Sequence, residues 1–303
     1  MFADSSDTIY LMALLGIFFA VAALVSWGFG DFFIQRATRQ IGVWRTLFFI
    51  DFAAALFFLP FIYEEIGPTF SNGRGMFLLT AAGLVIFLAA LLIFKSYKDG
   101  KLAIVEPILA FELPVVVALG IFTWGEKLSV IEILLIGSVF LGIVLAITKH
   151  HTHLHYHKRI FERGVVWAVL GAIVMGLGSF LLGVSSQETS PLFTMWYTSL
   201  ISVILCLFYM VPKGEVKKLI NDLRAHKKSV ISQVILDNAA WTFYAFSMTL
   251  IPISIATTIS ESYIALSVVL GIVVNHEKIQ RHQKIGVALA IAGVIFLGMV
   301  TGK

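Results

Sequence analysis

Cysteine and charge are both scarce in this 303-residue sequence. The single cysteine, Cys206, excludes an internal disulfide framework. Charged residues make up only 13% of the chain, against about 25% in an average soluble protein. Apolar residues make up 59%, including 26 phenylalanines, and the mean hydropathy is +0.93. Because so little polar surface cannot coat a water-soluble particle of this size, the composition predicts a polytopic membrane protein.

The small excess of basic residues does not indicate nucleic-acid binding. The net charge is +4, but Lys and Arg flank apolar segments and form no patch interleaved with exposed aromatic residues. The N-terminal residues include Asp4 and Asp7 without a basic cluster, a pattern that is not typical of a cleaved signal peptide.

Ten apolar segments are long enough to cross a bilayer, which requires about 20 residues per helix. Their apolar runs are continuous and not alternating, so they predict helices and not the strands of a barrel. The segments cover residues 9–33, 43–63, 76–94, 102–122, 130–148, 164–184, 192–211, 230–250, 253–274 and 285–300. We therefore expect an all-α membrane protein with ten transmembrane helices.

Two connections are longer than the rest. Residues 149–163 form a His-rich basic linker, in which His151/His155 and His153/His157 have spacings that could bind a metal loosely. No carboxylate or cysteine completes a metal site there, so we expect a solvated linker. Residues 212–229 carry apolar residues at helical spacing among basic ones, which fits either an amphipathic helix on an anionic membrane surface or a solvated basic loop.

Basic residues are concentrated on one side of the predicted membrane protein. Nineteen of the 22 Lys and Arg residues fall in the connections that join helices 1–2, 3–4, 5–6, 7–8 and 9–10. The positive-inside rule would place these connections in the cytoplasm and both termini outside.

The chain contains a weak internal repeat. Gly28-x-Gly30 aligns with Gly176-x-Gly178 at an offset of 148 residues, and the Glu-Lys pair at 126–127 aligns with that at 277–278 at an offset of 151. The two copies are residues 9–148 and 164–301, each with five expected helices. Because five is odd, the second copy must insert inverted relative to the first. Inverted repeats with a site at their interface are typical of secondary transporters.

The ends of the two halves resemble the EamA family of the drug/metabolite transporter superfamily. The resemblance rests on Glu106-Pro107, Pro114, Gly120 and Trp124-Gly125-Glu126-Lys127 in the first half, and on Glu261, Gly271, His276-Glu277-Lys278, Gln283, Gly286 and Gly293 in the second. It implies a cavity surrounded by the third, fourth, eighth and ninth helices, with the fifth and tenth packing the halves together. It also implies transport of small metabolites, often coupled to protons, and cytoplasmic termini, the opposite of what the charge distribution predicts.

Four acidic residues lie close to the midpoints of expected spans: Asp51, Glu112, Asp237 and Glu261. Each would cost roughly 2.5–3.5 kcal/mol on insertion scales if it faced lipid, so these side chains must face the bundle interior. No basic residue lies at comparable depth. Arg45 and Lys95 lie near helix ends, closer to Asp31 and Glu106 than to the four mid-span acids. We expect a structural ion-pair cluster there.

The neighbours of these acids suggest a binding site. Asp237 shares a helix face with Gln233, Trp241 and Tyr244, and Glu112 stands two residues before Pro114, which frees a backbone carbonyl and breaks the helix. The candidate substrate- and proton-binding residues are Glu112, Glu261, Asp237, Trp241, Tyr244, Asp51 and Tyr263. The alternative is structural: buried neutral carboxyls that donate hydrogen bonds, and aromatic residues that fill the core. Trp27 and Trp124 lie near span ends and are expected to be interfacial anchors.

The favoured hypothesis is a secondary transporter that moves a small polar metabolite, amino-acid-like or cationic, by alternating access coupled to protons. An organic-anion or nucleotide-sugar exchanger would require Lys or Arg at mid-depth. An intramembrane enzyme or a non-transporting sensor are further alternatives, although the chain has no HExxH or Gly-x-Ser-x-Gly motif. We expect no enzymatic activity, cofactor or metal. The expected partners are the bilayer of the cell (inner) membrane, the small-molecule substrate and the proton, with a monomer or weak homodimer as the assembly.

Overall fold

The computed structural model describes residues 5–99, 105, 108–147, 163–266, 269 and 280–301, and these ranges are helical without any strand. The first half comprises α1 (Ser5–Ile41), α2 (Val43–Ile62), α4 (Gly73–Asp99), α6 (Glu112–Phe122) and α7 (Val130–Ile147). The second comprises α9 (Arg163–Glu188), α10 (Pro191–Met210), α11 (Leu219–Leu250), α12 (Ile253–Glu261) and α14 (Arg281–Thr301). Three short helices, η1 (Tyr63–Glu65), α3 (Ile66–Ser71) and η2 (Glu215–Lys218), lie between the long ones. The His-rich linker and the motif at 276–278 lie outside the described residues.

The outer surface of the helical bundle is apolar, which confirms the prediction of an all-α, multi-pass membrane protein. Within the described residues, seven helices are long and apolar enough to span a bilayer: α1, α2 with its extension to Ser71, α4, α7, α9, α10 and α14. The fourth and ninth expected spans lie partly outside the described residues. Their described parts form shorter apolar helices, α6 and the stretch Ile253–Leu266. Large apolar side chains such as Phe57, Phe122 and Phe208 are 64%, 84% and 83% exposed, as lipid-facing residues would be.

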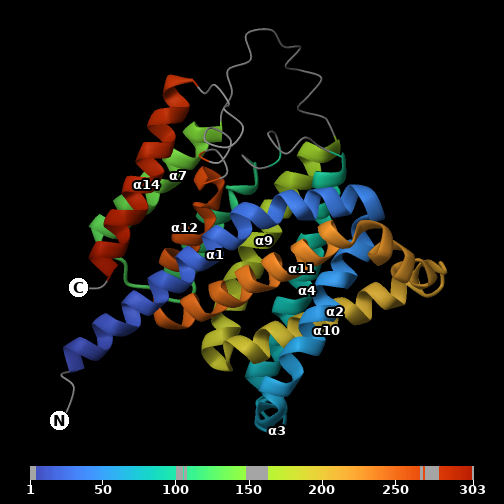
Figure 1. Ribbon diagram of the computed structural model, residues 1–303. Coiled ribbons are helices and arrows are strands. Elements are labelled where there is room, and N and C mark those ends of the chain that lie inside the picture. The colour runs from blue at the N-terminus through green and yellow to red at the C-terminus, as the bar shows by residue number, and fades with distance from the viewer. Residues whose placement is uncertain are drawn as a thin grey trace.

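Exchanging the two halves leaves the pattern of helix packing unchanged. Helix α1 packs along α11 and against α12, and in the same way α9 packs along α4 and against α6 (Figure 1). Helix α2 packs on its counterpart α10, and α7 packs on its counterpart α14. The structure therefore has the two-repeat architecture that the sequence offsets indicate.

The repeat extends to individual close contacts. A Cβ atom built on Gly28 would lie 2.9 Å from the side chain of Leu266, and one built on Gly176 would lie 2.6 Å from that of Val115. These two contacts are equivalent at the offsets of 148 and 151 residues found in the sequence. The aligned glycines are therefore positions where α1 and α9 closely approach the ninth and fourth spans.

Helices α7 and α14 join the two halves through small residues, as the spacings Ser138-xxx-Gly142 and Gly286-xxx-Ala290 predict. A Cβ atom on Gly142 would lie 2.6 Å from the backbone nitrogen of Ala290, so the helix backbones are nearly in contact. This pair lies at one side of the bundle in Figure 1. The packing interpretation of these spacings is confirmed.

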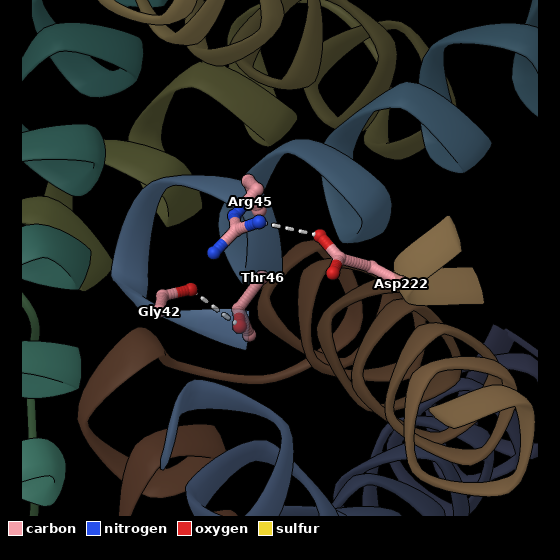
Figure 2. A network of polar contacts seen from close by, with 4 residues as sticks. All are labelled: Gly42, Arg45, Thr46 and Asp222. Carbon is pink, nitrogen blue, oxygen red and sulfur yellow. Dashed lines mark hydrogen bonds and ion pairs between the residues drawn. The ribbon is translucent and has the colours of Figure 1, made fainter. Parts of the chain in front are cut away.

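The segment 212–229 forms η2 and the first turns of α11, which bends at His226 (φ −124°, ψ 28°) before the expected span 230–250. Asp222 in this segment forms an ion pair of 2.8 Å with Arg45 at the start of α2, as Figure 2 shows. The expectation that Arg45 belongs to a cluster with Asp31 is therefore wrong. Lys95 lies instead over the ring of Trp167, 3.8 Å from its centre, and Glu106 is outside the described residues.

The loop after α6 caps the start of α12. Glu126 accepts hydrogen bonds from the backbone N–H of Ile253 at 2.5 Å and of Ser254 at 3.2 Å, and from the Ser254 hydroxyl at 2.5 Å. A Cβ atom on Gly120 would lie 2.5 Å from the Glu126 carboxylate, so this cap needs glycine at position 120. The Glu126 of the repeated Glu-Lys pair thus serves in the first half as a helix cap.

We expect Glu126→Ala to lower the free energy of unfolding by about 1–2 kcal/mol, because the N-terminal N–H groups of α12 lose their acceptor. Chemical or thermal denaturation in detergent would measure this loss. Glu64→Ala, at an exposed glutamate on the same side of the bundle, serves as the control and should change stability little. Equal stability of the two variants would contradict the capping role.

Candidate functional site

A cavity of about 1050 Å³, including its open mouth, lies between the two halves. Side chains of α1, α2, α4, α9, α10 and α11 line it, together with residues of the fourth and ninth spans. The expectation of a cavity formed by the third, fourth, eighth and ninth helices was therefore too narrow, because the first, second, sixth and seventh helices also contribute. None of the described lining residues comes from α7 or α14.

Five carboxylic acids line this one cavity: Asp31, Asp51, Glu112, Asp237 and Glu261. They come from α1, α2, α6, α11 and α12, so both halves contribute. No Lys, Arg or His is among the described residues that line the cavity. The site therefore concentrates potential negative charge without a basic counter-ion from the described part of its walls.

Asp237 lies where the aromatic wall meets the acidic residues. The side chains of Trp27 and Trp241 lie beside its carboxylate, and Asp31 and Asp51 are close enough to interact with it electrostatically. The rings of Trp27 and Trp241 pack edge to face, with their centres 5.2 Å apart. Trp27 is only 6% exposed and lines the cavity, so the expectation that it is an interfacial anchor is wrong.

Hydroxyl groups hold two further aspartates. Ser202 of α10 donates a hydrogen bond to Asp51. The side chains of Tyr97 and Tyr263 hydrogen-bond to Asp31, and Tyr263, a predicted site residue, also lines the cavity. Asp31 was missed as a site residue because the predicted first span ended at residue 33, whereas α1 continues to Ile41 and places Asp31 well inside the helix.

Glu112 and Glu261 both lie at breaks in their helices. The fourth span turns at Ala110 and Phe111 before α6 begins at Glu112, as Pro114 predicted. The ninth span turns at Ser262, directly after Glu261, although no proline is present there. These breaks are equivalent at the offset of 151 residues. Interrupted helices with their polar ends at the repeat interface are a recurrent feature of transporter binding sites.

Two carboxylate–hydroxyl contacts lie at equivalent positions of the repeat, but the carboxylate and the hydroxyl exchange places between them. Ser179 of α9 donates a hydrogen bond of 2.5 Å to Glu112. At the repeat offsets, Ser179 corresponds to Asp31 and Glu112 corresponds to Tyr263. The two equivalent contacts are therefore both carboxylate–hydroxyl pairs, and the first half supplies both carboxylates: Asp31 from its first span and Glu112 from its fourth.

Tyr244, also predicted as a site residue, lies behind the cavity wall. It is fully buried and hydrogen-bonds to Thr257 at 2.6 Å. Its ring packs against Trp27, with 5.2 Å between centres, and it is not among the lining residues. The other six predicted residues, Glu112, Glu261, Asp237, Trp241, Asp51 and Tyr263, all line the cavity.

The cavity lies nearer the basic side of the bundle. Its lining includes Ile34, Leu47 and Tyr97, which lie close to the helix ends on the basic side. On the opposite side the helix ends are joined: Trp124 donates to Gln187 at 3.0 Å, and Gln187 donates to the carbonyl of Met248 at 2.7 Å. Trp124 thus links α6, α9 and α11 at the closed end of the site.

The acids of the cavity are spread around its described walls. Within the ranges that the structure describes, no three His, Cys, Asp or Glu side chains are grouped closely enough to hold one ion. The five acids are therefore arranged around the cavity and do not converge on a point.

Comparison with known proteins agrees with this architecture. A model of the EamA-like transporter family matches residues 14–148 and 162–299, one match per half. Among solved structures, one crystal structure described only as that of a protein matches 98% of this chain and 99% of its own, with a TM-score of 0.62 at 13% identity, which shows a shared fold. No curated protein matches the sequence. Because the family model covers nearly the whole chain in two repeats, this protein belongs to the EamA-like transporter family.

Proposed function

We propose that the protein is a secondary transporter that carries a small organic cation or amino-acid-like metabolite across the cell membrane by alternating access, coupled to protons. One observation carries this proposal: five carboxylic acids and no basic side chain line the cavity among the described residues. A substrate with a positive group would supply the missing counter-charge, and protons would supply it when the substrate is absent. The aromatic faces of Trp27 and Trp241 add cation–π attraction.

The same lining disfavours the alternative substrates. An organic anion or a nucleotide sugar would have to enter a cavity of five acids whose described lining has no Lys or Arg to bind its negative groups. We propose no catalytic role for these acids and no cofactor, and a monomer suffices because the cavity lies within one chain.

A thermal-shift screen of the purified protein tests the substrate class. A ligand that binds only the folded state raises the apparent melting temperature as its concentration exceeds its Kd. We expect amines or amino acids to stabilise the wild type and to lose this effect in Glu112→Gln and Glu261→Gln, while the exposed control Glu64→Gln keeps it. Stabilisation by organic anions that persists in both cavity variants would refute the proposal.

Transport itself requires a flux measurement in liposomes. A pH gradient should drive uptake of the stabilising amine, and Glu112→Gln or Glu261→Gln should abolish that response. Binding without any flux would instead indicate a sensor.

A further inference from the structure

Buried polar groups without partners are concentrated on α1 and α11, two helices that pack along each other. Gln233 of α11 is fully buried, and neither atom of its amide has a hydrogen-bond partner. The hydroxyl of Thr38 on α1 is also fully buried and unpaired, and so is the amide nitrogen of Gln35, one turn beyond Asp31. These three residues account for four of the seven such atoms in the part of the chain that the structure describes.

The register of the two helices places these groups in a line. Helices α1 and α11 are antiparallel: Ser247 donates to the carbonyl of Gly16 at 2.8 Å, and a Cβ atom on Gly30 would lie 3.4 Å from Leu236. Continued toward the basic side, this register puts Gln233 one turn beyond Asp237 and Thr38 about one further turn along. Polar groups therefore follow one another at every turn from the cavity acids to the basic end of the helix pair.

Unpaired amide and hydroxyl groups are rarely left dry inside a protein. A buried amide that forms no hydrogen bond loses its hydration without compensation, and such groups are usually satisfied by ordered water. Gln233 alone offers a carbonyl acceptor and two N–H donors, enough to bind more than one water molecule.

We propose that bound water molecules occupy this seam between α1 and α11 and form a proton path from the basic side of the membrane to the cavity acids. The seam residues are Gln35, Thr38 and Gln233. The path ends at Asp31 of α1 and Asp237 of α11, which are close enough to interact electrostatically, with Asp51 of α2 as the third acid near Asp237. From Asp31 to Thr38 is seven residues, about 10 Å along a helix, a span that a few water molecules would bridge.

Along such a path, protons pass from one water molecule to the next. A water next to Asp237 would give its proton to the carboxylate and take another from the next water, and the last water would take its proton from the bulk. At the basic end, the bend of α11 at His226 interrupts the helical backbone and would open the seam to solvent. Protons would then reach the acids without passing the substrate in the cavity.

The internal repeat supplies independent support. Thr38 aligns with Ser186 at the same offset of 148 residues that relates Gly28 to Gly176. Ser186 is 2% exposed, and its hydroxyl also has no partner; the same is true of the hydroxyl of fully buried Ser185. In an inverted repeat, equivalent positions lie toward opposite faces, so a second hydrated site is placed on the other side of the acids.

Reaction of an engineered thiol tests whether the seam holds water, independently of transport. In a Cys206→Ala background, Thr38→Cys is treated with methyl methanethiosulfonate, a small neutral reagent that reacts with the thiolate, and modification is followed by intact-mass spectrometry. Because a thiol ionises only where water reaches it, we expect Thr38→Cys to react at least tenfold faster than Ala37→Cys or Ala240→Cys, two fully buried positions on the same helices. Adding Gln233→Leu to Thr38→Cys should slow its reaction toward the controls. Equal rates for Thr38→Cys and both controls would overturn the water-filled seam.

The proton role rests on the proposed function and has its own test. In proteoliposomes with a pH gradient, we expect Gln233→Leu to slow proton-driven uptake of a stabilising amine at least fivefold and to leave its Kd unchanged, because Gln233 does not line the cavity. Unchanged uptake would overturn the proton path. Absence of uptake in the wild type would instead refute the proposed function, while the thiol rates still decide whether the seam is hydrated.

Discussion

Gly286→Ala is expected to be among the most destabilising single-methyl substitutions in the protein. A Cβ atom at this position would overlap the backbone nitrogen of Ala146 and lie 2.6 Å from the carbonyl oxygen of Gly142. Both are backbone atoms of α7, so no side-chain rotation relieves the overlap, and α7 and α14 must move apart. Overpacking of this kind typically costs about 1–3 kcal/mol. Because α7 and α14 also join the two repeats, the loss should appear as a lower melting temperature and a smaller fraction of folded protein after extraction.

The matched control lies on the partner helix. Gly137 of α7 is exposed, and a Cβ atom there would meet no atom within 4 Å. Since alanine is the better helix former by about 1 kcal/mol, Gly137→Ala should leave the melting temperature unchanged or raise it. If Gly286→Ala and Gly137→Ala melted at the same temperature, α7 and α14 could not pack as closely as the structure has them.

The helices and the repeat were predictable because hydrophobic length and close glycine contacts are local properties. A continuous apolar run must be helical in lipid. The glycines at 28 and 176 repeat because each permits a close approach between α1 or α9 and a helix of the other half. Residue spacing alone was therefore enough to find the two halves.

The predicted acids of the site were found from their position along the expected membrane spans. The errors at Asp31 and Trp27 arose from the same criterion. Asp51, Glu112, Asp237 and Glu261 stood out because they lie at mid-span, where a charge is costly. Asp31 and Trp27 were placed near a helix end because the apolar run of the first span weakens after residue 33. The helix in fact continues to Ile41, and only the packing of α1 against α11 shows that both residues face the cavity. The break after Glu261 was likewise hidden, since no proline marks it.

Asp237→Asn is expected to abolish most of the affinity for a positively charged ligand and at the same time to stabilise the empty protein. Asparagine keeps the shape of the side chain and an oxygen that can accept from the indole N–H groups of Trp27 and Trp241, so the cavity wall should persist. A hydrogen bond to a charged group contributes about 1.5–3 kcal/mol. Its loss should raise the Kd of a primary amine such as butylamine about 10- to 100-fold.

The gain in stability has a separate cause. Asp237 interacts unfavourably with Asp31 and Asp51, and the described cavity lining provides no basic residue to offset this. At alkaline pH, where protons no longer neutralise these acids, removing the Asp237 charge should therefore raise the melting temperature of the ligand-free protein. Asp222→Asn on the same helix provides a control of opposite sign, because Asp222 forms an ion pair with Arg45, and its neutralisation should lower the melting temperature without affecting amine binding.

Two outcomes would contradict this argument in different ways. An Asp237→Asn protein that binds butylamine as tightly as the wild type would mean that the cavity acids are structural hydrogen-bonding groups. A protein that loses binding and also melts at a lower temperature would mean that the Asp237 charge is already neutralised in the empty state by a group that binds there. The expected combination is weaker binding with greater stability. A transport site shows both if its acids are held apart from any counter-ion, because the substrate or the proton can then supply the positive charge.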